Sequence, residues 1–463
     1  MSKTSFMNRN KTMDLTTGGI FKQLMIFALP LLAGQLFQTL YNSVDSVVIG
    51  RFESAQALAA VSASGSISMI VSGFFNGMSA GASAVFAKYF GAKDKKSLHD
   101  SIHTTVMFSI FFGAILAGLG IILTPTLLKI TTCPEAIWEM AVQYLSIYLI
   151  GIFFTCMYNV AAAVLRSIGD SQSPFIFLVI SSLLNIVLDV LLVVVIPLGV
   201  VGVALATIIA QGISMVLAFW KMMRLDDEYR FRFSHMRIKW NYLGEVARLG
   251  LPAGIQSSLT AIGALIVQTY TNSFSEVAIA GISSAMRIDQ FAGMLCNALG
   301  LAMTTFIGQN LGAGKNDRAH RAVGISTLVA MVYVIVISIP MYIFAPQLVS
   351  IFSLDAEVIQ YGTGFLRVIM PVYTMMALNQ LYGGILRGFR YSITAMVCVI
   401  VGYLVIRQAW LFITLNYIEH NVQYLYWCYP AGWIGASVPM VFIYLVFIRR
   451  KFRSEKPVAV GEY

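Results

Sequence analysis

Charged residues are scarce in this 463-residue chain. Asp, Glu, Lys and Arg make up only 11% of it, whereas about a quarter of a typical soluble domain is charged. Apolar residues reach 58%, and the mean hydropathy is +0.77. This composition excludes the set of soluble domains that the length alone would suggest, and it predicts an integral membrane protein.

Paired cysteines are also missing. The five cysteines are isolated and show no C-x-x-C spacing, so no disulfide framework is expected. We interpret them as small buried apolar residues. They are Cys133, Cys156, Cys296, Cys398 and Cys428.

Signatures of soluble enzymes are absent as well. GQNLGAGKN has five residues between Gly308 and Gly314 where a phosphate loop has four, and Asn316 stands where that loop needs Ser or Thr. His99 and His103 are four residues apart, but no third ligand with metal spacing is nearby in the sequence. We therefore expect no catalytic residues, no metal site, no direct use of ATP, and no enzyme activity.

Twelve apolar segments are each longer than the roughly 20 residues that a membrane span needs. They are 22–50, 57–87, 101–129, 136–165, 173–197, 200–222, 247–273, 277–307, 321–351, 356–386, 391–417 and 424–448. An even number of spans places both termini on one side. All Lys and Arg residues lie on that side except Arg51, Lys129, Arg287, Arg367 and Arg407. We expect a protein of the cell membrane with both termini cytoplasmic, whose charge of +10 reflects orientation and lipid contact and not nucleic-acid binding.

The two halves of the chain resemble each other. NGMSAGASAVFAKYFGAKDKK, from Asn76, aligns with NALGLAMTTFIGQNLGAGKND, from Asn297, at a shift of 221 residues. Six spans in each unit make the copies parallel, with a pseudo-twofold axis along the membrane normal. The predicted fold is all-α, with twelve transmembrane helices in two six-helix bundles. Its parts are an N-lobe at 1–222, a cytoplasmic linker at 223–246 and a C-lobe at 247–463.

Small residues and prolines predict how the spans pack and bend. Gly73, Gly77 and Gly81 recur every four residues, which favours close helix packing over a ligand site. Three prolines lie inside spans, where they should kink or locally unwind the helix. They are Pro30, Pro252 and Pro371.

In the linker, a short surface helix is expected near 240–248, and a regulatory role is the alternative to a simple bridge.

Polar groups within the spans of the first half form one set. Asp45 lies near the outer end of span one, on the same helical stripe as Gln35, Gln38 and Asn42. Spans five and six add Asn185, Asp189, Thr207 and Gln211. Two acids without a Lys or Arg in the same spans predict a cation or proton site. The alternative is that the acids only lock helices together through fixed hydrogen bonds.

The second half carries different groups. Span seven offers Gln256, and span eight carries Arg287 and Asp289 two residues apart, on opposite helix faces. Asp289 could meet a cationic substrate and Arg287 a carboxylate, or both could pair structurally. Arg407 in span eleven is interpreted as a member of a structural or gating ion pair.

At these residues the chain resembles the MATE family of multidrug and toxin extrusion transporters. The stretches that carry the resemblance are LPLLAGQLFQTLYNSVDSVVIGRF, AGAS with KYFGAKD, LRSIGDSQSP, NIVLDVLLV, GQNLGAGKND and LRGFRYS. The resemblance implies alternating access between two lobes and export of mostly cationic amphipathic compounds in exchange for H⁺ or Na⁺. It also implies that Asp45 is the N-lobe acid of span one and that Asn185, Asp189 and Thr207 form the coupling-ion cluster.

One departure from the family pattern concerns the C-lobe. NorM-type relatives have acids in spans seven and ten, whereas this chain has Gln256 or Thr260 and then Ala377 and Asn379. A sodium site in the C-lobe is therefore not expected.

The resulting hypothesis is a monomeric secondary antiporter of small organic cations, with no cofactor other than H⁺ or Na⁺ as the coupling ion. The predicted coupling-ion residues are Asp45, Asn185, Asp189 and Thr207. The predicted substrate cavity contains Gln35, Gln38, Asn42, Gln211, Gln256, Arg287 and Asp289. A lipid-linked saccharide flippase of the same superfamily is the nearest alternative, and a receptor or channel is a more distant one.

Overall fold

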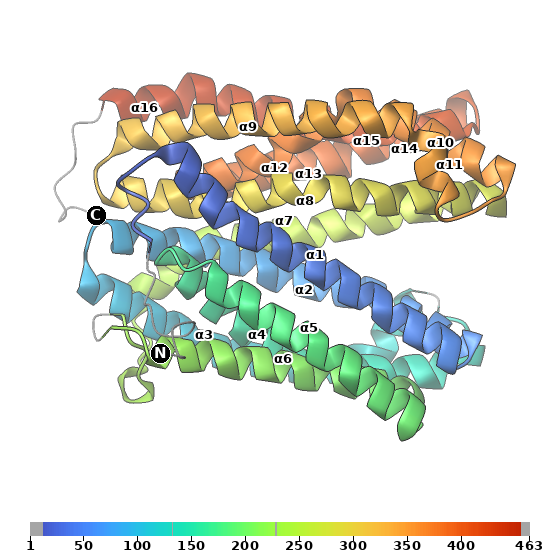
Figure 1. Cartoon of the computed structure of the whole chain (residues 1–463), viewed down its shortest axis with the longest axis horizontal. Helices are drawn as coiled ribbons and strands as arrows, with labels where there is room; N and C mark the ends of the chain where they lie inside the picture. Colours follow the sequence, from blue (N-terminus) through green and yellow to red (C-terminus); the bar gives the residue numbers. More distant parts are fainter. Residues whose placement is uncertain (1–12, 132, 227–228, 455–463) are drawn as a thin grey trace, which may run out of the picture.

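The computed structural model describes residues 13–131, 133–226 and 229–454, and in this part of the chain all regular structure is helical (Figure 1). The first half forms α1 (Ile20–Phe52), α2 (Ala55–Gly91), α3 (Lys95–Ile130), η1 (Glu135–Ile137), α4 (Trp138–Ser167), α5 (Gln172–Asp189), η2 (Val190–Val195) and α6 (Gly199–Met223). A short 3-10 turn, η3 (Phe233–His235), lies in the linker.

The second half forms α7 (Trp240–Thr271), α8 (Glu276–Gly312), α9 (Asn316–Ile343), α10 (Ala345–Ser350), α11 (Ala356–Ile369), η4 (Met370–Val372), α12 (Tyr373–Gly388), α13 (Ser392–Ile400), η5 (Val401–Ile406), α14 (Arg407–Ile413), η6 (Thr414–Ile418), α15 (Val422–Ile443), η7 (Tyr444–Ile448) and α16 (Arg449–Ser454). Eleven of the described helical segments are long and apolar enough to cross a membrane. The twelfth predicted span corresponds to α11 and α12, which the turn η4 separates. The predicted all-α membrane fold is confirmed.

The three intramembrane prolines behave differently. Pro371 lies in the 3-10 turn η4, so the predicted local unwinding is confirmed there. Pro30 and Pro252 lie inside the continuous helices α1 and α7. A membrane helix tolerates proline where neighbouring groups satisfy the freed carbonyl, so proline alone does not break it. The expected short helix at 240–248 is also part of α7, since its first turns run into the span without a break.

Two helical bundles lie side by side in Figure 1, with α3 to α6 in one and α9 to α15 in the other. The contact between them runs through α2, which packs against both α7 and α8. The linker, the turn at 92–94 and the turn at 313–315 share one end of the molecule, which we call the linker end. The domain boundaries at 222 and 247 stay a prediction.

Close helix packing at the predicted glycines is confirmed. A methyl group on Gly77 would lie 2.1 Å from the carbonyl oxygen of Ala253, and one on Gly81 would lie 2.4 Å from that of Leu249. No Cβ fits at such distances, so glycine is what lets the backbones of α2 and α7 touch. The bundles are therefore in direct backbone contact over the half of α2 nearest the linker end.

Polar ties reinforce this contact at the linker end. Glu245 on α7 pairs with Lys88 (3.3 Å) and accepts a hydrogen bond from Tyr89, both on α2. Arg390 of the second bundle reaches the same carboxylate at 2.6 Å. Buried Gln309 on α8 donates to the carbonyl of Ser167 at the end of α4, at 2.7 Å. The bonds of Glu245 to α2 and of Gln309 to Ser167 hold the two bundles together at this end, and Arg390 fixes the Glu245 carboxylate within the second half.

Replacing Gly81 with alanine tests the packing. We expect Gly81→Ala to lower the free energy of unfolding by about 1–3 kcal/mol, because the new methyl group must push α7 away. The matched control is Gly65→Ala in the same helix, where no atom lies within 4 Å of the added methyl group. Denaturation of the purified protein in detergent measures both, and equal effects would contradict the proposed close packing.

Candidate functional site

The two predicted N-lobe acids meet in the structure. The carboxyl groups of Asp45 on α1 and Asp189, the last residue of α5, are neighbours within electrostatic range of each other. The packing of α1 against α5 brings them together. Asp189 is fully buried, and no donor from another described residue reaches either of its oxygens.

An uncompensated contact of this kind is unfavourable. Two ionised carboxylates repel each other strongly in a medium of low dielectric constant, so the contact requires a proton or a cation between the oxygens. Within the described residues, neither acid forms an ion pair with Lys, Arg or His. The pair is therefore a site where one small positive charge is required and the protein supplies none.

Helix geometry changes at this site. α5 ends at Asp189, and the next six residues form the π-helical segment η2, which the bond from Ile196 N to Leu191 O closes at 2.9 Å. Such segments often occur at functional sites because they leave backbone groups less regularly paired. The sequence Val-Leu-Leu-Val-Val-Val gives no signal for this change of geometry.

Neutral oxygen and amide groups accompany the acids. Asn185 lies one turn before Asp189, and neither atom of its buried amide has a partner among the described residues. The Thr207 hydroxyl on α6 donates to the carbonyl of Val203 at 3.0 Å, which leaves its oxygen free to accept. Carboxylate, amide and hydroxyl oxygens are the ligand types that hard cations prefer.

Tyrosines around the pair were not predicted. Tyr41 on α1 lies in electrostatic range of both acids. Tyr144 on α4 is in range of the same two acids and stacks with Tyr148. Tyr41 lies four residues before Asp45, and the two α4 tyrosines are also four apart, so helical spacing could have indicated them.

The other predicted polar groups of the first half are spread along the bundle. Gln35 donates to Asn297 of α8 at 3.3 Å, so this part of the stripe faces the second bundle. Gln38 is exposed, and the side chain of Asn42 lies outside those that the structure describes. Gln211 accepts from Thr155 of α4 at 2.5 Å, which fixes it inside the first bundle.

In the second bundle, Arg287 is exposed and Asp289 is half-buried, and they do not pair with each other. Asp289 instead faces Tyr373, whose hydroxyl donates to its backbone carbonyl at 3.1 Å. The side-chain oxygen of Gln256 is buried and has no partner among the described residues.

The ion-pair prediction for Arg407 is wrong. Its side chain is buried, and no carboxylate of the described residues lies within 4.0 Å. Its guanidinium instead lies over the rings of Tyr403, at 4.8 Å, and Tyr429, at 5.9 Å. The aromatic faces provide the attraction that a carboxylate was expected to give.

The premise that His99 and His103 lack a third metal ligand is also wrong. His235 of the linker lies beside them, and one nitrogen of each ring falls within 4.8 Å of the others. No local sequence pattern indicates this contact, because His235 is more than 130 residues away from both.

Both halves of the chain match a known protein family, and individual relatives match along most of its length. A family model described as MatE matches residues 30–191 and 252–413, once in each half. The chain is 28% identical over 402 residues to YpnP of Bacillus subtilis, named a probable multidrug resistance protein, covering 86% of this chain and 89% of the relative. It is 24% identical over 390 residues to a protein of Shewanella oneidensis named FAD transporter, covering 83% and 85%.

Among solved structures, a multidrug resistance MATE family transporter of the MOP superfamily, described as outward-facing, aligns with a TM-score of 0.86. The sequence identity is 22%, and the alignment covers 96% of this chain and 99% of that one. At this identity the likeness establishes the shared fold.

A double-mutant cycle tests the contact between the acids. Asp45→Asn and Asp189→Asn should show a coupling energy of about 0.5–3 kcal/mol in the free energy of unfolding, because each change alters what the other residue touches. Asp45→Asn combined with Asp289→Asn is the control, and its effects should add to within about 0.5 kcal/mol. Additive effects in the first pair would show that the carboxyl groups do not interact.

Proposed function

Because the chain belongs to the MatE family of membrane transporters, as the sequence resemblance indicated, we propose that it is a secondary antiporter. It exports small cationic, amphipathic organic compounds across the cell membrane in exchange for inward H⁺ or Na⁺. The observation that carries this proposal is the proximity of half-buried Asp45 to fully buried Asp189, a pair that needs one positive charge and has no basic partner among the described residues.

The coupling ion acts by neutralising the pair. With a proton or Na⁺ between the carboxyl groups, α1 stays packed against α5. When the ion leaves, repulsion favours an arrangement in which the acids are apart or contact another cation. An ion drives transport only through such a difference in affinity between conformations. Asn185 and Thr207 contribute neutral oxygens in the same bundle, which suits Na⁺ as well as H⁺.

Alternation requires the linker end to open. We place the linker and both termini on the cytoplasmic side, as the distribution of Lys and Arg predicts. The backbone contacts of Gly77 and Gly81 and the ties of Glu245 then close the transporter toward the cytoplasm. The cytoplasm-open state must break these contacts. The site of Asp45 and Asp189 lies within the first bundle, away from the contacts that close the linker end.

The acid pair also favours cationic substrates over anionic ones. A flippase for pyrophosphate-linked lipids needs a strongly cationic cavity. Here the two acids of the first bundle have no basic partner among the described residues, and buried Arg407 is covered by tyrosine rings. A relative is named for transport of FAD, so the family by itself does not fix the substrate, and the charge of this site is the stronger argument.

Transport by Asp45→Asn tests the proposal directly. In proteoliposomes with a pH or a sodium gradient imposed separately, the variant should lose gradient-driven export at least about tenfold, since the pair can no longer exchange its positive charge. Glu419→Gln, which neutralises an exposed acid, should transport normally. Equal melting temperatures of the unsubstituted protein and both variants would show that all three are folded. Unchanged gradient-driven export by Asp45→Asn would then refute the proposed coupling site.

Glu245→Gln tests the closure at the linker end. Removing this carboxylate weakens its ties to Lys88 and Tyr89 on α2, so the population that is open at this end should grow. Spin labels at positions 93 and 314, in a background without native cysteines, report the separation of the two turns at this end. The distance distribution should shift to longer values in Glu245→Gln and stay unchanged in Glu139→Gln, at the opposite end. An identical distribution in both variants would exclude this role for Glu245.

A further inference from the structure

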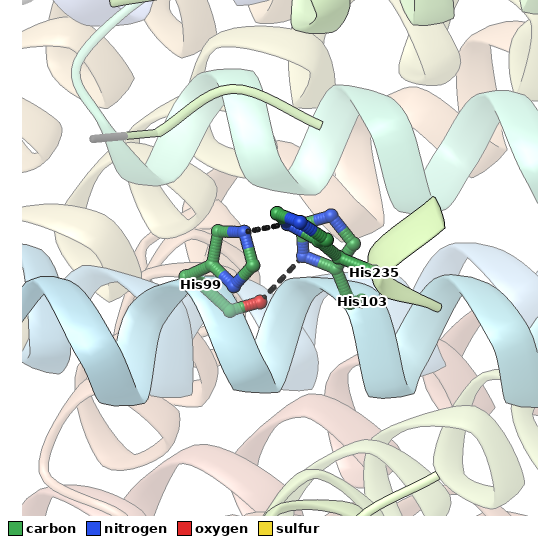
Figure 2. A group of neighbouring side chains, drawn as sticks. All are labelled: His99, His103 and His235. Carbon is green, nitrogen blue, oxygen red and sulfur yellow. Dashed lines mark hydrogen bonds between the residues drawn. The ribbon is translucent and has the colours of Figure 1, made fainter. Parts of the chain in front are cut away.

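Three histidines lie together at the linker end, outside the candidate transport site (Figure 2). His99 and His103 are on one face of α3, and His235 reaches them from η3 in the linker. The rings of His99 and His103 stack with centroids 4.0 Å apart, and that of His235 lies 5.2 Å from His99. These are three of the five histidines of the chain.

One nitrogen of each ring lies within 4.8 Å of the others, and one pair of these nitrogens already has the spacing found around a metal ion. His235 Nδ1 and His99 Nε2 are 3.3 Å apart. Two imidazole nitrogens bound to tetrahedral zinc, each about 2.0–2.1 Å from it, are themselves about 3.3–3.4 Å apart. We propose that His99, His103 and His235 bind one divalent transition-metal cation with imidazole preference, such as Zn²⁺, with the fourth position open to water.

His103 must exchange a bond to become a ligand. Its Nδ1 contacts the carbonyl of His99 at 2.7 Å, and its Nε2 accepts from the backbone N–H of Arg232 at 3.0 Å. His103 therefore already ties α3 to the linker, and its ring stacks on Phe231 at 5.1 Å. A metal ion replaces one of these bonds, so binding is coupled to the local arrangement of the linker.

Charged groups around the cluster bear on cation binding. Asp100 lies 3.9 Å from His99 Nδ1 and pairs with Lys239 at 2.5 Å. Arg232 and Lys239 are the basic groups in electrostatic range of His99. Because Asp100 already neutralises Lys239, the positive charge near the histidines is smaller than the basic linker sequence suggests. Repulsion of a divalent cation is reduced accordingly.

Bound metal would fasten the linker to α3. The linker joins the two repeated halves, so the cation would stabilise the arrangement in which η3 is docked on the first bundle. A ligand that binds only this arrangement raises its population by mass action. The site goes beyond the proposed transport function and depends neither on the exported compound nor on the coupling ion.

Cobalt and zinc binding to the purified full-length protein, with any affinity tag removed, tests the proposal. Titration with Co²⁺ should give the visible absorption of a tetrahedral site that saturates at one ion per chain, and Zn²⁺ should displace it. His99→Ala and His235→Ala should each weaken binding at least about tenfold. His420→Ala, which removes an exposed histidine at the other end of the molecule, should leave binding unchanged.

His235 is exposed, so its removal should not impair folding, and equal melting temperatures without metal would verify this. Addition of Zn²⁺ should then raise the melting temperature of the unsubstituted protein and of His420→Ala, but not that of His235→Ala. Absence of saturable binding at micromolar concentrations, or equal affinity in His235→Ala, would overturn the proposal. Neither result would affect the transport tests with Asp45→Asn.

Discussion

A contact between two acids inside the membrane is the constraint on which the site depends. Asp45 and Asp189 lie within electrostatic range of each other, yet the described residues offer no base to neutralise them. Such a pair is stable only with an added positive charge, so the docking of α1 on α5 is linked to the occupancy of the site. The surrounding tyrosines and the unpartnered amide of Asn185 give it a polar lining without fixing its charge.

The two repeated halves share a backbone plan but differ in chemistry. Where α7 would carry the counterpart of Asp45 stand apolar Ile266 and Val267, and buried Val267 contributes to an apolar cluster. The second bundle instead buries Arg407 beneath tyrosine rings and places Asp289 against Tyr373. The symmetry of the fold therefore does not extend to its charges, and only the first bundle brings two acids into contact among the described residues.

The sequence predicted the helical fold well because long apolar runs and internal repetition are local signals. It also indicated the contact of Gly77 and Gly81 with another helix, since small residues at every fourth position have one main use. The sequence grouped Asp45 and Asp189 in one predicted site, but it did not indicate that His235 lies beside the α3 histidines. Contacts between separate helices depend on packing angles and rotations that no local pattern encodes. Pro252 lies within an uninterrupted α7 for a related reason, because neighbouring groups decide whether a proline unwinds a span.

The distance of 144 residues between the two acids has a consequence for how the protein is made. At about 5–20 residues/s, α1 emerges from the ribosome roughly 7–30 s before α5 is complete. During that interval Asp45 must enter the bilayer without its partner, at a cost of a few kcal/mol on insertion scales. The apolar residues of α1 have to outweigh this cost alone. Membrane insertion therefore sets a minimum hydrophobicity for the first helix. The folded transporter, in which Asp45 has its partner, would not need this minimum.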